Sequence, residues 1–360
     1  MNILQIIDSL QFGGAERMAV SISNVLAKSG HSVVLCASRS KGKLEKFVEP
    51  GIKLVTLNKK STIDFNALFR LLQIIRKNRI QIIHAHSSSV FWAILIKIIM
   101  PKIKVIWHDH LGARISGNSV NKYYKFISPL ISGIISVNDK LKEWAVQNMR
   151  VIPKNILFIN NFPLIRELPR NTKPGITKIV CLANLRQQKD HQTLVKAIHI
   201  IIKELPEHNL KFIFAGLFRH DAYYLDLIKL IKTLGLKETI QIKGPVEDTA
   251  ALLAAADIGV LSSVSEGLPV SLLEYGLVGL PVVVTDVGQC HEVTGDGKFG
   301  LVVPPFNPVE LAKALIILIN NKKRRSKMGD EFKKFVIEKY GAKQFLSQYN
   351  GLLKKMYRND

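Results

Sequence analysis

The sequence predicts an α/β protein in which two doubly wound domains follow one another. Its 360 residues suit about two domains. A composition of 47% hydrophobic and 22% charged residues is globular, which excludes a disordered or collagen-like chain. Short apolar runs alternate with amphipathic stretches in both halves, as in parallel sheets covered by helices. Three prolines and a glycine interrupt the alternation over residues 162–175, so we expect a linker there and domains at 1–168 and 169–341.

The N-terminal half opens with a βαβ unit. Its turn contains Gly13 and Gly14, and Gly30 stands where the C-terminal cap of the helix is expected. The crossover implies a parallel sheet with helices on both faces. The elements expected in this half are strands at 3–7, 31–37, 53–57, 80–85, 104–107, 134–137 and 156–159, and helices at 15–28, 65–77 and around Phe91.

The alternation restarts after the linker. The elements expected there are strands at 178–183, 211–215, 240–242, 258–261 and 281–285, and helices at 192–204, 223–234, 249–255 and 269–277. After Pro308 the pattern is helical to the last residue, with a short break near Gly341. Doubly wound domains bind ligands beyond the carboxyl ends of their strands. Two of them facing each other would form a cleft, where we expect the functional residues.

The chain is strongly basic. Its 51 Lys and Arg residues against 28 Asp and Glu residues give a formal charge of +23. This charge calls for an anionic partner, such as nucleic acid, an anionic membrane surface or a phosphorylated substrate. The basic residues are not interleaved with aromatic ones and no nucleic-acid-binding signature appears, so we expect no nucleic acid partner. Peripheral attraction to an anionic membrane remains.

Targeting and redox features favour the cytoplasm. The first ten residues lack the basic region and cleavage site of a signal peptide. The most apolar stretch, 90–100, is too short for a bilayer, which needs about 20 residues. The three cysteines are too far apart for a disulfide framework or a metal motif. We expect a soluble cytoplasmic protein.

The strongest candidate site contains two glutamates. Glu266 is expected in a loop after a strand, and Glu274 more than a turn inside the following helix. Backbone N–H groups around Gly267 and Leu268 would bind an anion at the helix start, where the missing N–H of Pro269 is harmless. A sugar nucleotide would supply a diphosphate there, and hydroxyl groups from which ionised carboxylates accept hydrogen bonds. Either glutamate alone would be read as a surface acid.

A cationic loop follows the first strand of the C-terminal half. It spans residues 183–191 and contains Arg186 and Lys189. Two cations in a strand-to-helix loop suit a diphosphate, because negative charge grows on it as a glycosidic bond breaks. The alternative is that both are ordinary surface cations.

Two H-x-H pairs each end a strand of the N-terminal half. They are His84 with His86, and His108 with His110. A strand places residues i and i+2 on one face about 7 Å apart, and no cysteine or acidic cluster completes a zinc shell, so we predict no metal site. The chain also lacks a D-x-D tripeptide, the commonest clamp between metal and diphosphate, which predicts metal-independent chemistry. Core packing is the alternative role for the first pair.

The glutamate segment resembles a known family. Its pattern S-x-x-x-E-G-x-P-x-x-x-x-E, from Ser262 to Glu274, looks like the E-x7-E motif of retaining GT-B glycosyltransferases, specifically glycosyltransferase family 4. The flanking segments 244–260 and 279–305 resemble the same family in the same order. The resemblance implies a GT-B fold, with two Rossmann-like domains facing each other across a cleft. It also implies that a last helix, at about 342–360, joins the first domain.

The resemblance assigns roles to the donor-side residues. In the family the first glutamate lies near the donor sugar and the second binds the ribose hydroxyls, roles that fall to Glu266 and Glu274. Lys189 matches the lysine of the family's G-R-L-x-x-x-K segment. Asn184 stands in place of that segment's arginine, and Arg186 is the candidate to supply the missing guanidinium.

On the acceptor side, Gly13 and Gly14 match a G-G-x-E element of the family that faces the donor phosphates. Either His108 or His110 corresponds to a family histidine beside the reacting sugar. The resemblance further implies a UDP- or GDP-sugar donor held by the C-terminal domain, an acceptor held by the N-terminal domain, retention of anomeric configuration and no cofactor.

The basic surface and the apolar stretch 90–100 suit an acceptor at the inner face of the cell membrane. We therefore expect a glycan or lipid-linked glycan acceptor, used in cell-surface polysaccharide such as lipopolysaccharide or capsule. The alternatives are a sugar-nucleotide epimerase or glycan synthase on the same fold, a basic nucleic-acid-binding protein, or an inactive regulator.

Overall fold

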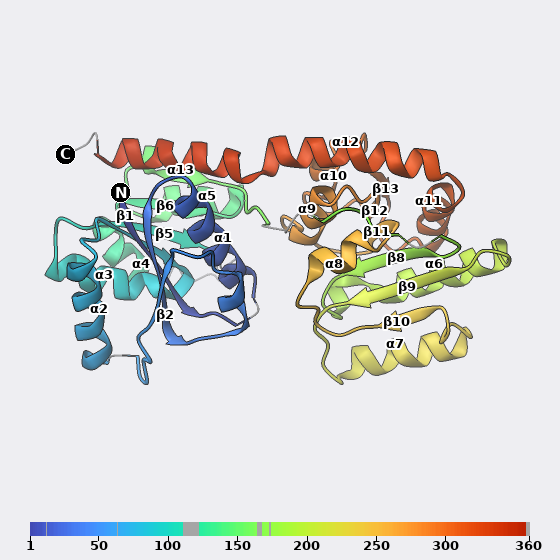
Figure 1. The fold of residues 1–360 in the computed structure, drawn as a ribbon, viewed down its shortest axis with the longest axis horizontal. Coiled ribbons are helices and arrows are strands. Elements are labelled where there is room, and N and C mark those ends of the chain that lie inside the picture. The colour runs from blue at the N-terminus through green and yellow to red at the C-terminus, as the bar shows by residue number, and fades with distance from the viewer. Residues whose placement is uncertain (12, 63, 111–121, 164–167, 173, 358–360) are drawn as a thin grey trace. The chain divides into compact units, whose positions relative to one another are not determined.

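A computed structural model describes residues 1–360 except 12, 63, 111–121, 164–167, 173 and 358–360. Its contacts divide the chain into two compact units (Figure 1). Unit 1 comprises Met1–Pro163 and Ala342–Asp360, and unit 2 comprises Leu164–Gly341. Residues 164–167 and 173 of the expected linker lie outside the described part of the chain.

The division between Pro163 and Leu164 lies before the expected boundary at 168/169. The residues just after that expected boundary are bonded to unit 2. The Arg170 guanidinium donates to the carbonyl oxygens of Ala256 and Gly279 at 2.7 and 2.9 Å. The Asn171 N–H donates to the carbonyl oxygen of Ala254 at 2.9 Å.

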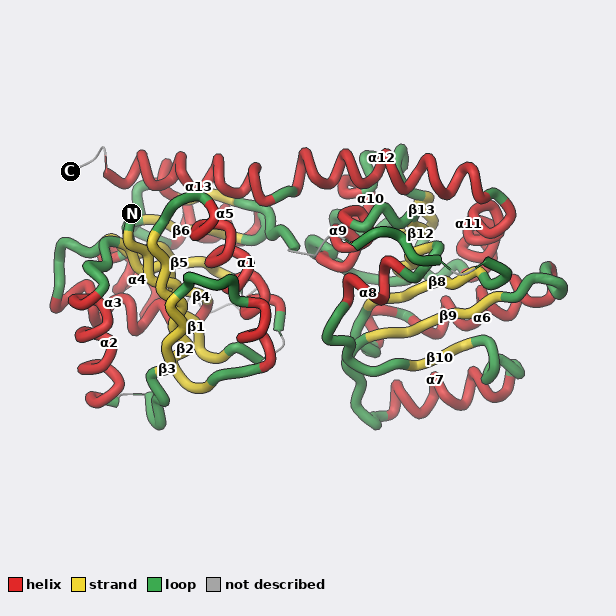
Figure 2. Tube along the Cα trace, in the orientation of Figure 1, coloured by secondary structure: helices red, strands yellow, loops and turns green. Residues whose placement is uncertain are grey.

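Unit 1 is built on a seven-stranded parallel sheet with the strand order β3-β2-β1-β4-β5-β6-β7 (Figure 2). The order reverses between β1 and β4, which is the arrangement of a doubly wound sheet. The strands are β1 (Asn2–Ser9), β2 (Ser32–Ser40), β3 (Lys53–Thr56), β4 (Ile82–His86), β5 (Lys104–Asp109), β6 (Gly133–Ser136) and β7 (Ile156–Phe158). The helices are α1 (Gly14–Lys28), α2 (Phe65–Lys77), α3 (Val90–Ile99), α4 (Lys122–Ile127), α5 (Asp139–Asn148) and α13 (Ala342–Tyr357).

Helices cover both faces of this sheet, as the alternating sequence pattern predicts. On one face α1 and α13 bury Ile22 and Tyr349 against strand residues such as Ile106. On the other face α2 and α3 bury Leu71 and Ile94 in the same apolar cluster as further strand residues. No helix in the described parts of the chain is long and apolar enough to cross a bilayer.

The expected cap of the first helix is present. Gly30 has a φ of +88°, in the left-handed region that favours glycine. Its N–H donates to the carbonyl of Ala27 at 3.0 Å, and the N–H of His31 donates to the carbonyl of Leu26 at 3.1 Å. This pair of bonds is the Schellman motif, and it turns the chain from α1 directly into β2.

Unit 2 repeats the architecture with a six-stranded parallel sheet of order β10-β9-β8-β11-β12-β13. The strands are β8 (Thr177–Leu182), β9 (Leu210–Ala215), β10 (Ile240–Ile242), β11 (Ile258–Leu261), β12 (Val282–Thr285) and β13 (Leu301–Val303). The helices are α6 (His191–Glu204), α7 (Ala222–Thr233), α8 (Thr249–Ala254), α9 (Val270–Leu277), α10 (Cys290–Val293), α11 (Pro308–Asn320) and α12 (Lys322–Tyr340). The reversal of strand order lies between β8 and β11, and both loops that contain the predicted donor residues leave the sheet there.

Candidate active site

Two loops meet at the carboxyl edge of the unit 2 sheet. One connects β8 to α6 and contains Lys189, and the other connects β11 to α9 and contains Glu266. Because β8 and β11 are parallel neighbours, both loops leave the sheet at the same edge. The structure thus brings together two residues that are far apart in the sequence, at the place where doubly wound sheets bind ligands.

Lys189 and Glu266 form an ion pair. The Lys189 Nζ lies 2.5 Å from Glu266 Oε1, and the hydroxyl of Ser263 donates to the same oxygen at 2.6 Å. Only 20% of the lysine side chain and 8% of the glutamate side chain are exposed. Charge-assisted bonds shielded from water hold both side chains in a defined position. Ser263 was not among the predicted site residues, although it belongs to the recognised motif.

The backbone fixes the two loops to each other. The N–H of Val264 donates to the carbonyl of Gln188 at 2.9 Å, and the hydroxyl of Ser262 donates to the carbonyl of Lys189 at 3.0 Å. The hydroxyl of Thr285, at the end of β12, donates to the carbonyl of Ser263 at 2.6 Å. These bonds hold the two loops, and with them the ion pair, in one arrangement, which is the preorganisation that electrostatic catalysis needs.

A third loop supports the glutamate from the other side. Gly288, between β12 and α10, has a φ of +53°, and a Cβ added there would lie 2.0 Å from the carbonyl oxygen of Glu266. Only glycine fits this close approach. The N–H of Gln289 donates to the carbonyl of Gly267 at 3.2 Å.

The cationic loop presents its two cations differently. Arg186 has an extended backbone and an exposed side chain, and it precedes the short 3₁₀ turn Gln187–Lys189. Asp190 follows with a φ of +43° and caps α6 by accepting the N–H of Thr193 at 3.2 Å. The turn leaves Arg186 exposed while Lys189 reaches Glu266.

Asn184, where the family segment has arginine, has a structural role. Its Oδ1 accepts the N–H of Leu217 at 2.9 Å. The neighbouring Gly216 approaches so closely that an added Cβ would lie 2.2 Å from the carbonyl oxygen of Ala183. The asparagine therefore joins the loop after β8 to the loop after β9. Asn184 carries no charge, so Arg186 remains the candidate to supply the guanidinium of the family segment.

Glu274 lies in the second turn of α9 and is 7% exposed, so it is not the surface acid that a lone glutamate would suggest. The side chain of the adjacent Tyr275 packs in the core of unit 2, and its hydroxyl accepts the N–H of Leu182 at 2.6 Å. This bond fixes the rotation of α9. The first turn of that helix follows Gly267 and Leu268, with Pro269 at the N-cap, and its leading N–H groups have no acceptor within the helix.

In unit 1 the four histidines of the two H-x-H pairs lie together. His84 and His86 end β4, and His108 and His110 lie at the end of the neighbouring β5. Nitrogen atoms of His84, His86 and His108 lie within 4.8 Å of one another, so these three side chains could surround a metal ion. The sequence pattern predicted the two pairs separately and did not predict this convergence.

Burial disfavours the charged form of these rings. It lowers the pKa of His84 and of His110 to about 3, and those of His86 and His108 well below their usual value. The rings are therefore neutral near pH 7.

Gly13 is the N-cap of α1, with Gly14 as its first residue, and neither has a positive φ.

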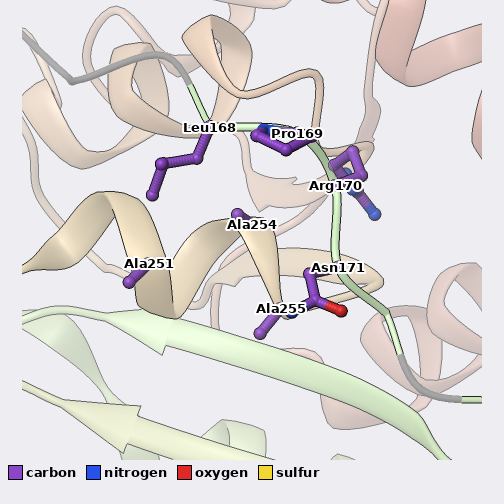
Figure 3. A pocket seen from close by; sticks show the side chains of 7 residues that line it. All are labelled: Leu168, Pro169, Arg170, Asn171, Ala251, Ala254 and Ala255. Carbon is purple, nitrogen blue, oxygen red and sulfur yellow. The ribbon is translucent and has the colours of Figure 1, made fainter.

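Hollows elsewhere on unit 2 lie away from the ion pair. One of about 400 Å³ lies between the linker and α8, lined by residues such as Pro169, Arg170 and Ala254 (Figure 3). Another, of about 810 Å³, includes Lys178 and Lys211 at the starts of β8 and β9. Neither hollow is lined by Lys189 or Glu266, and the second also reaches Lys243 and Val246, which follow β10.

Comparison with known families agrees with the geometry. A sequence model of glycosyl transferases group 1 matches residues 166–335, and one of Glycosyltransferase Family 4 matches residues 12–162. Together the two matches span nearly all of both units. The chain is a GT-B glycosyltransferase of the family 4 type.

Individual relatives of this glycosyltransferase span almost the whole chain. It is 24% identical to the N-acetyl-alpha-D-glucosaminyl L-malate synthase of Bacillus anthracis, over 97% of this chain and 95% of that protein. It is 26% identical to the O-antigen biosynthesis glycosyltransferase WbnH of Escherichia coli, over 82% of this chain and 85% of that protein. Among solved structures, Anabaena Alr3699/HepE in complex with UDP and glucose aligns with a TM-score of 0.73 and 18% identity, over 98% of this chain and 99% of that one. The glycosyltransferase thus shares its two-domain α/β fold with that structure.

Proposed function

We propose that this glycosyltransferase binds a nucleotide-diphosphate sugar, a UDP- or GDP-sugar, on unit 2 and transfers the sugar to an acceptor hydroxyl. The observation that carries the proposal is the shielded ion pair of Lys189 and Glu266 at the carboxyl edge of the sheet. A structural relative that was solved with UDP and glucose supports the choice of donor class.

Each donor-side residue has a part in the proposed reaction. Lys189, Arg186 and the N–H groups that open α9 stabilise the charge that grows on the departing diphosphate. Glu266 orients Lys189 and lies near the donor sugar, and the Glu274 carboxylate accepts hydrogen bonds from the ribose hydroxyls. We propose that these groups do the work of a metal clamp, so that the reaction uses neither metal nor cofactor.

The transfer retains anomeric configuration in this proposal. The bond between the anomeric carbon and the diphosphate oxygen breaks, and a bond from the acceptor oxygen to the same carbon forms on the same face. The acceptor proton moves to the departing phosphate oxygen. The phosphate is thereby the base, so no second carboxylate is needed, in contrast to glycoside hydrolases.

We propose a glycan or lipid-linked glycan as the acceptor, bound by unit 1 and used in cell-surface polysaccharide. A relative named for O-antigen biosynthesis supports this class. The surface of unit 1 supports attachment to an anionic membrane at the cytoplasmic face. Phe65 and Phe69 of α2 are 77% and 60% exposed, and Ile98 of α3 is 61% exposed. The basic Arg76 and Lys77 lie exposed in the last turn of α2.

The donor proposal is tested by thermal shift with UDP-, GDP- and ADP-sugars. A true donor stabilises the folded chain by mass action, by about 2.7 kcal/mol at a concentration 100 times its dissociation constant. Lys189→Ala should lose part of this stabilisation, and the control Lys196→Ala, an exposed lysine of α6, should keep it. Equal responses to every nucleotide sugar would contradict the proposal.

The membrane proposal is tested by flotation with phosphatidylglycerol vesicles and with neutral phosphatidylcholine vesicles. We expect the chain to float with the anionic vesicles and the double variant Phe65→Ser/Phe69→Ser to stay behind. Leu225→Ser is the control, because it removes a 59% exposed leucine from α7 of unit 2. Equal flotation of the wild type with both vesicles would remove the proposal.

A further inference from the structure

Four of the five histidines of unit 1, those at the ends of β4 and β5, form two pairs that meet edge to edge. His84 Nε2 lies 3.2 Å from His108 Nδ1, and His86 Nδ1 lies 3.1 Å from His110 Nε2. The two pairs lie over each other. The ring centroids of His84 and His86 are 4.7 Å apart, and those of His108 and His110 are 4.1 Å apart, with interplanar angles of 13° and 22°.

Gln5 joins the two pairs at one end. It lies on β1 beside His84 on β4 and is completely buried. Its amide nitrogen is 3.1 Å from His84 Nδ1, and its amide oxygen is 2.8 Å from His86 Nε2. Five side chains thus form one continuous hydrogen-bonded chain, in the order His108, His84, Gln5, His86 and His110.

With the Gln5 amide oriented as the structure has it, nitrogen toward His84 and oxygen toward His86, the position of each proton follows. An amide nitrogen can only donate, so His84 Nδ1 must be bare and His84 Nε2 must carry the proton that goes to His108 Nδ1. The amide oxygen can only accept, so His86 Nε2 carries a proton and His86 Nδ1 accepts from His110 Nε2. Because all four rings are neutral, each then has its proton on Nε2.

The two ends of the chain are consequently different. The proton on His108 Nε2 points from a fully buried ring and has no partner among the described residues. At the other end the unprotonated nitrogen is Nδ1 of His110, which is the partly exposed one of the four histidines. An unprotonated imidazole nitrogen accepts a hydrogen bond from a hydroxyl group. It repels an ionised phosphate-ester oxygen, because that oxygen carries no proton and can only accept.

The same geometry argues against a metal ion at these rings. The facing nitrogens are already joined in imidazole–imidazole and amide hydrogen bonds. Stacked rings also direct their lone pairs along nearly parallel planes instead of toward one centre. A divalent ion would need these protons displaced and the rings turned toward it.

We propose that Gln5 is a positioning residue that holds His110 as the Nε2–H tautomer, so that its Nδ1 accepts a hydrogen bond from a neutral sugar hydroxyl of the substrate. This proposal rests on the proposed function for the identity of the substrate. In this proposal the tautomer of His110 distinguishes a sugar hydroxyl from a phosphate oxygen. The opposite tautomer would present an N–H group at Nδ1, which suits a phosphate oxygen.

The tautomers are read by long-range ¹H–¹⁵N spectra of the full chain labelled with ¹⁵N-histidine. We expect Nε2–H tautomers for all four rings in the wild type. Gln5→Glu places a carboxylate that accepts from both neighbours, so His84 and His108 should change to Nδ1–H while His86 and His110 stay unchanged. Gln5→Met, which removes both bonds without a buried charge, should leave each pair as a mixture of tautomers. Gln73→Met, at an exposed position of α2, is the control and should change none.

Two chemical probes test the recognition itself. Methyl α-D-glucoside should shift the His110 Nδ1 resonance of the wild type, and dimethyl phosphate, an ionised phosphodiester without an O–H group, should not. In Gln5→Met the glucoside shift should fall, and dimethyl phosphate should begin to shift the resonance.

Other outcomes overturn the proposal. They are an Nδ1–H tautomer at His110 in the wild type, a Gln5→Glu variant that changes both pairs or neither, and a dimethyl phosphate response equal to the glucoside response. One equivalent of zinc bound to the purified chain and lost on His84→Ala would replace the network with a metal site. Failure of the proposed function would show differently, as no stabilisation by any nucleotide sugar with the tautomers as described.

Discussion

The two units differ in charge at the corresponding edges of their sheets. In unit 2 the carboxyl edge of the sheet holds an ionised pair, Lys189 and Glu266, which hydrogen bonds from neighbouring loops support. In unit 1 the corresponding edge holds neutral imidazoles, joined to one another and to Gln5. One fold therefore supports a charged site suited to a diphosphate and an uncharged site suited to hydroxyl groups. The difference lies in the side chains that end the strands.

The largest expected effect concerns the buried neutral histidines. His84, His110 and also His191 have pKa values lowered by burial to about 3, whereas the unfolded chain has a histidine pKa of about 6.5. Below about pH 6.5 the unfolded state binds more protons, so the free energy of unfolding falls as the pH decreases toward 3. Each ring contributes about 1.4 kcal/mol per pH unit in that window.

Thermal unfolding at pH 7.5, 6.0 and 5.0 measures this loss. His191→Phe should reduce the pH dependence by about one proton, because it removes one buried neutral ring. His208→Asn is the matched control at an exposed position and should leave the pH dependence unchanged. A free energy of unfolding that is constant from pH 7.5 to 5.0 would contradict the neutral assignment.

The next largest effect is expected at the charged site. Lys189→Ala removes the cation that, in our proposal, faces the departing diphosphate, whose charge is greatest in the transition state. We expect kcat to fall about 10²- to 10³-fold, with a smaller change in donor affinity. Steady-state kinetics beside Lys196→Ala checks this, and an unchanged kcat would mean that the diphosphate lies elsewhere.

Gly288 tests whether the loop behind Glu266 is as close as the structure describes. Gly288→Ala should destabilise the chain by about 3 kcal/mol, through a strained φ and a clash with the Glu266 carbonyl. Gly235→Ala, at a φ of +72° with nothing within 4 Å of its Cβ, should cost only about 1 kcal/mol. Equal melting temperatures for the two variants would refute the close approach.

The smallest effect is expected at Glu274. Glu274→Ala removes a buried carboxylate that we assign to the ribose hydroxyls, and should weaken donor binding by about 1–3 kcal/mol. Calorimetric titration with UDP and GDP measures it, with Glu238→Ala as an exposed control. The assignment fails if both variants bind the nucleotide like the wild type.

The sequence predicted the fold well where its signals were local. The Gly30 cap and the alternation of apolar and amphipathic runs predicted most helices and strands near their observed places. Helix α5 was not predicted because its apolar residues are few, although Asn138 caps it by accepting the N–H of Leu141 at 2.8 Å. Strand β13 has only three residues between a glycine and two prolines, too short for a period to show.

The candidate site was predictable in its residues but not in its contacts. The motif around Glu266 and the loop around Lys189 are legible in the sequence, yet only the adjacency of β8 and β11 brings them together. The same holds for the histidines, which meet because β4 and β5 are neighbours. Gln5 was missed, and its signal was a single amide within the otherwise apolar run of residues 3–7.

The most direct test of the central claim compares nucleotides with and without phosphates. Calorimetry should measure the affinities of UDP and uridine, and of GDP and guanosine, for the wild type and for Lys189→Met. The account predicts that the diphosphate strengthens binding at least about tenfold in the wild type, roughly the worth of one charge-assisted bond, and that the variant loses most of this gain. An equal ratio of nucleotide to nucleoside affinity in both proteins would contradict the claim that this ion pair is built to hold a diphosphate.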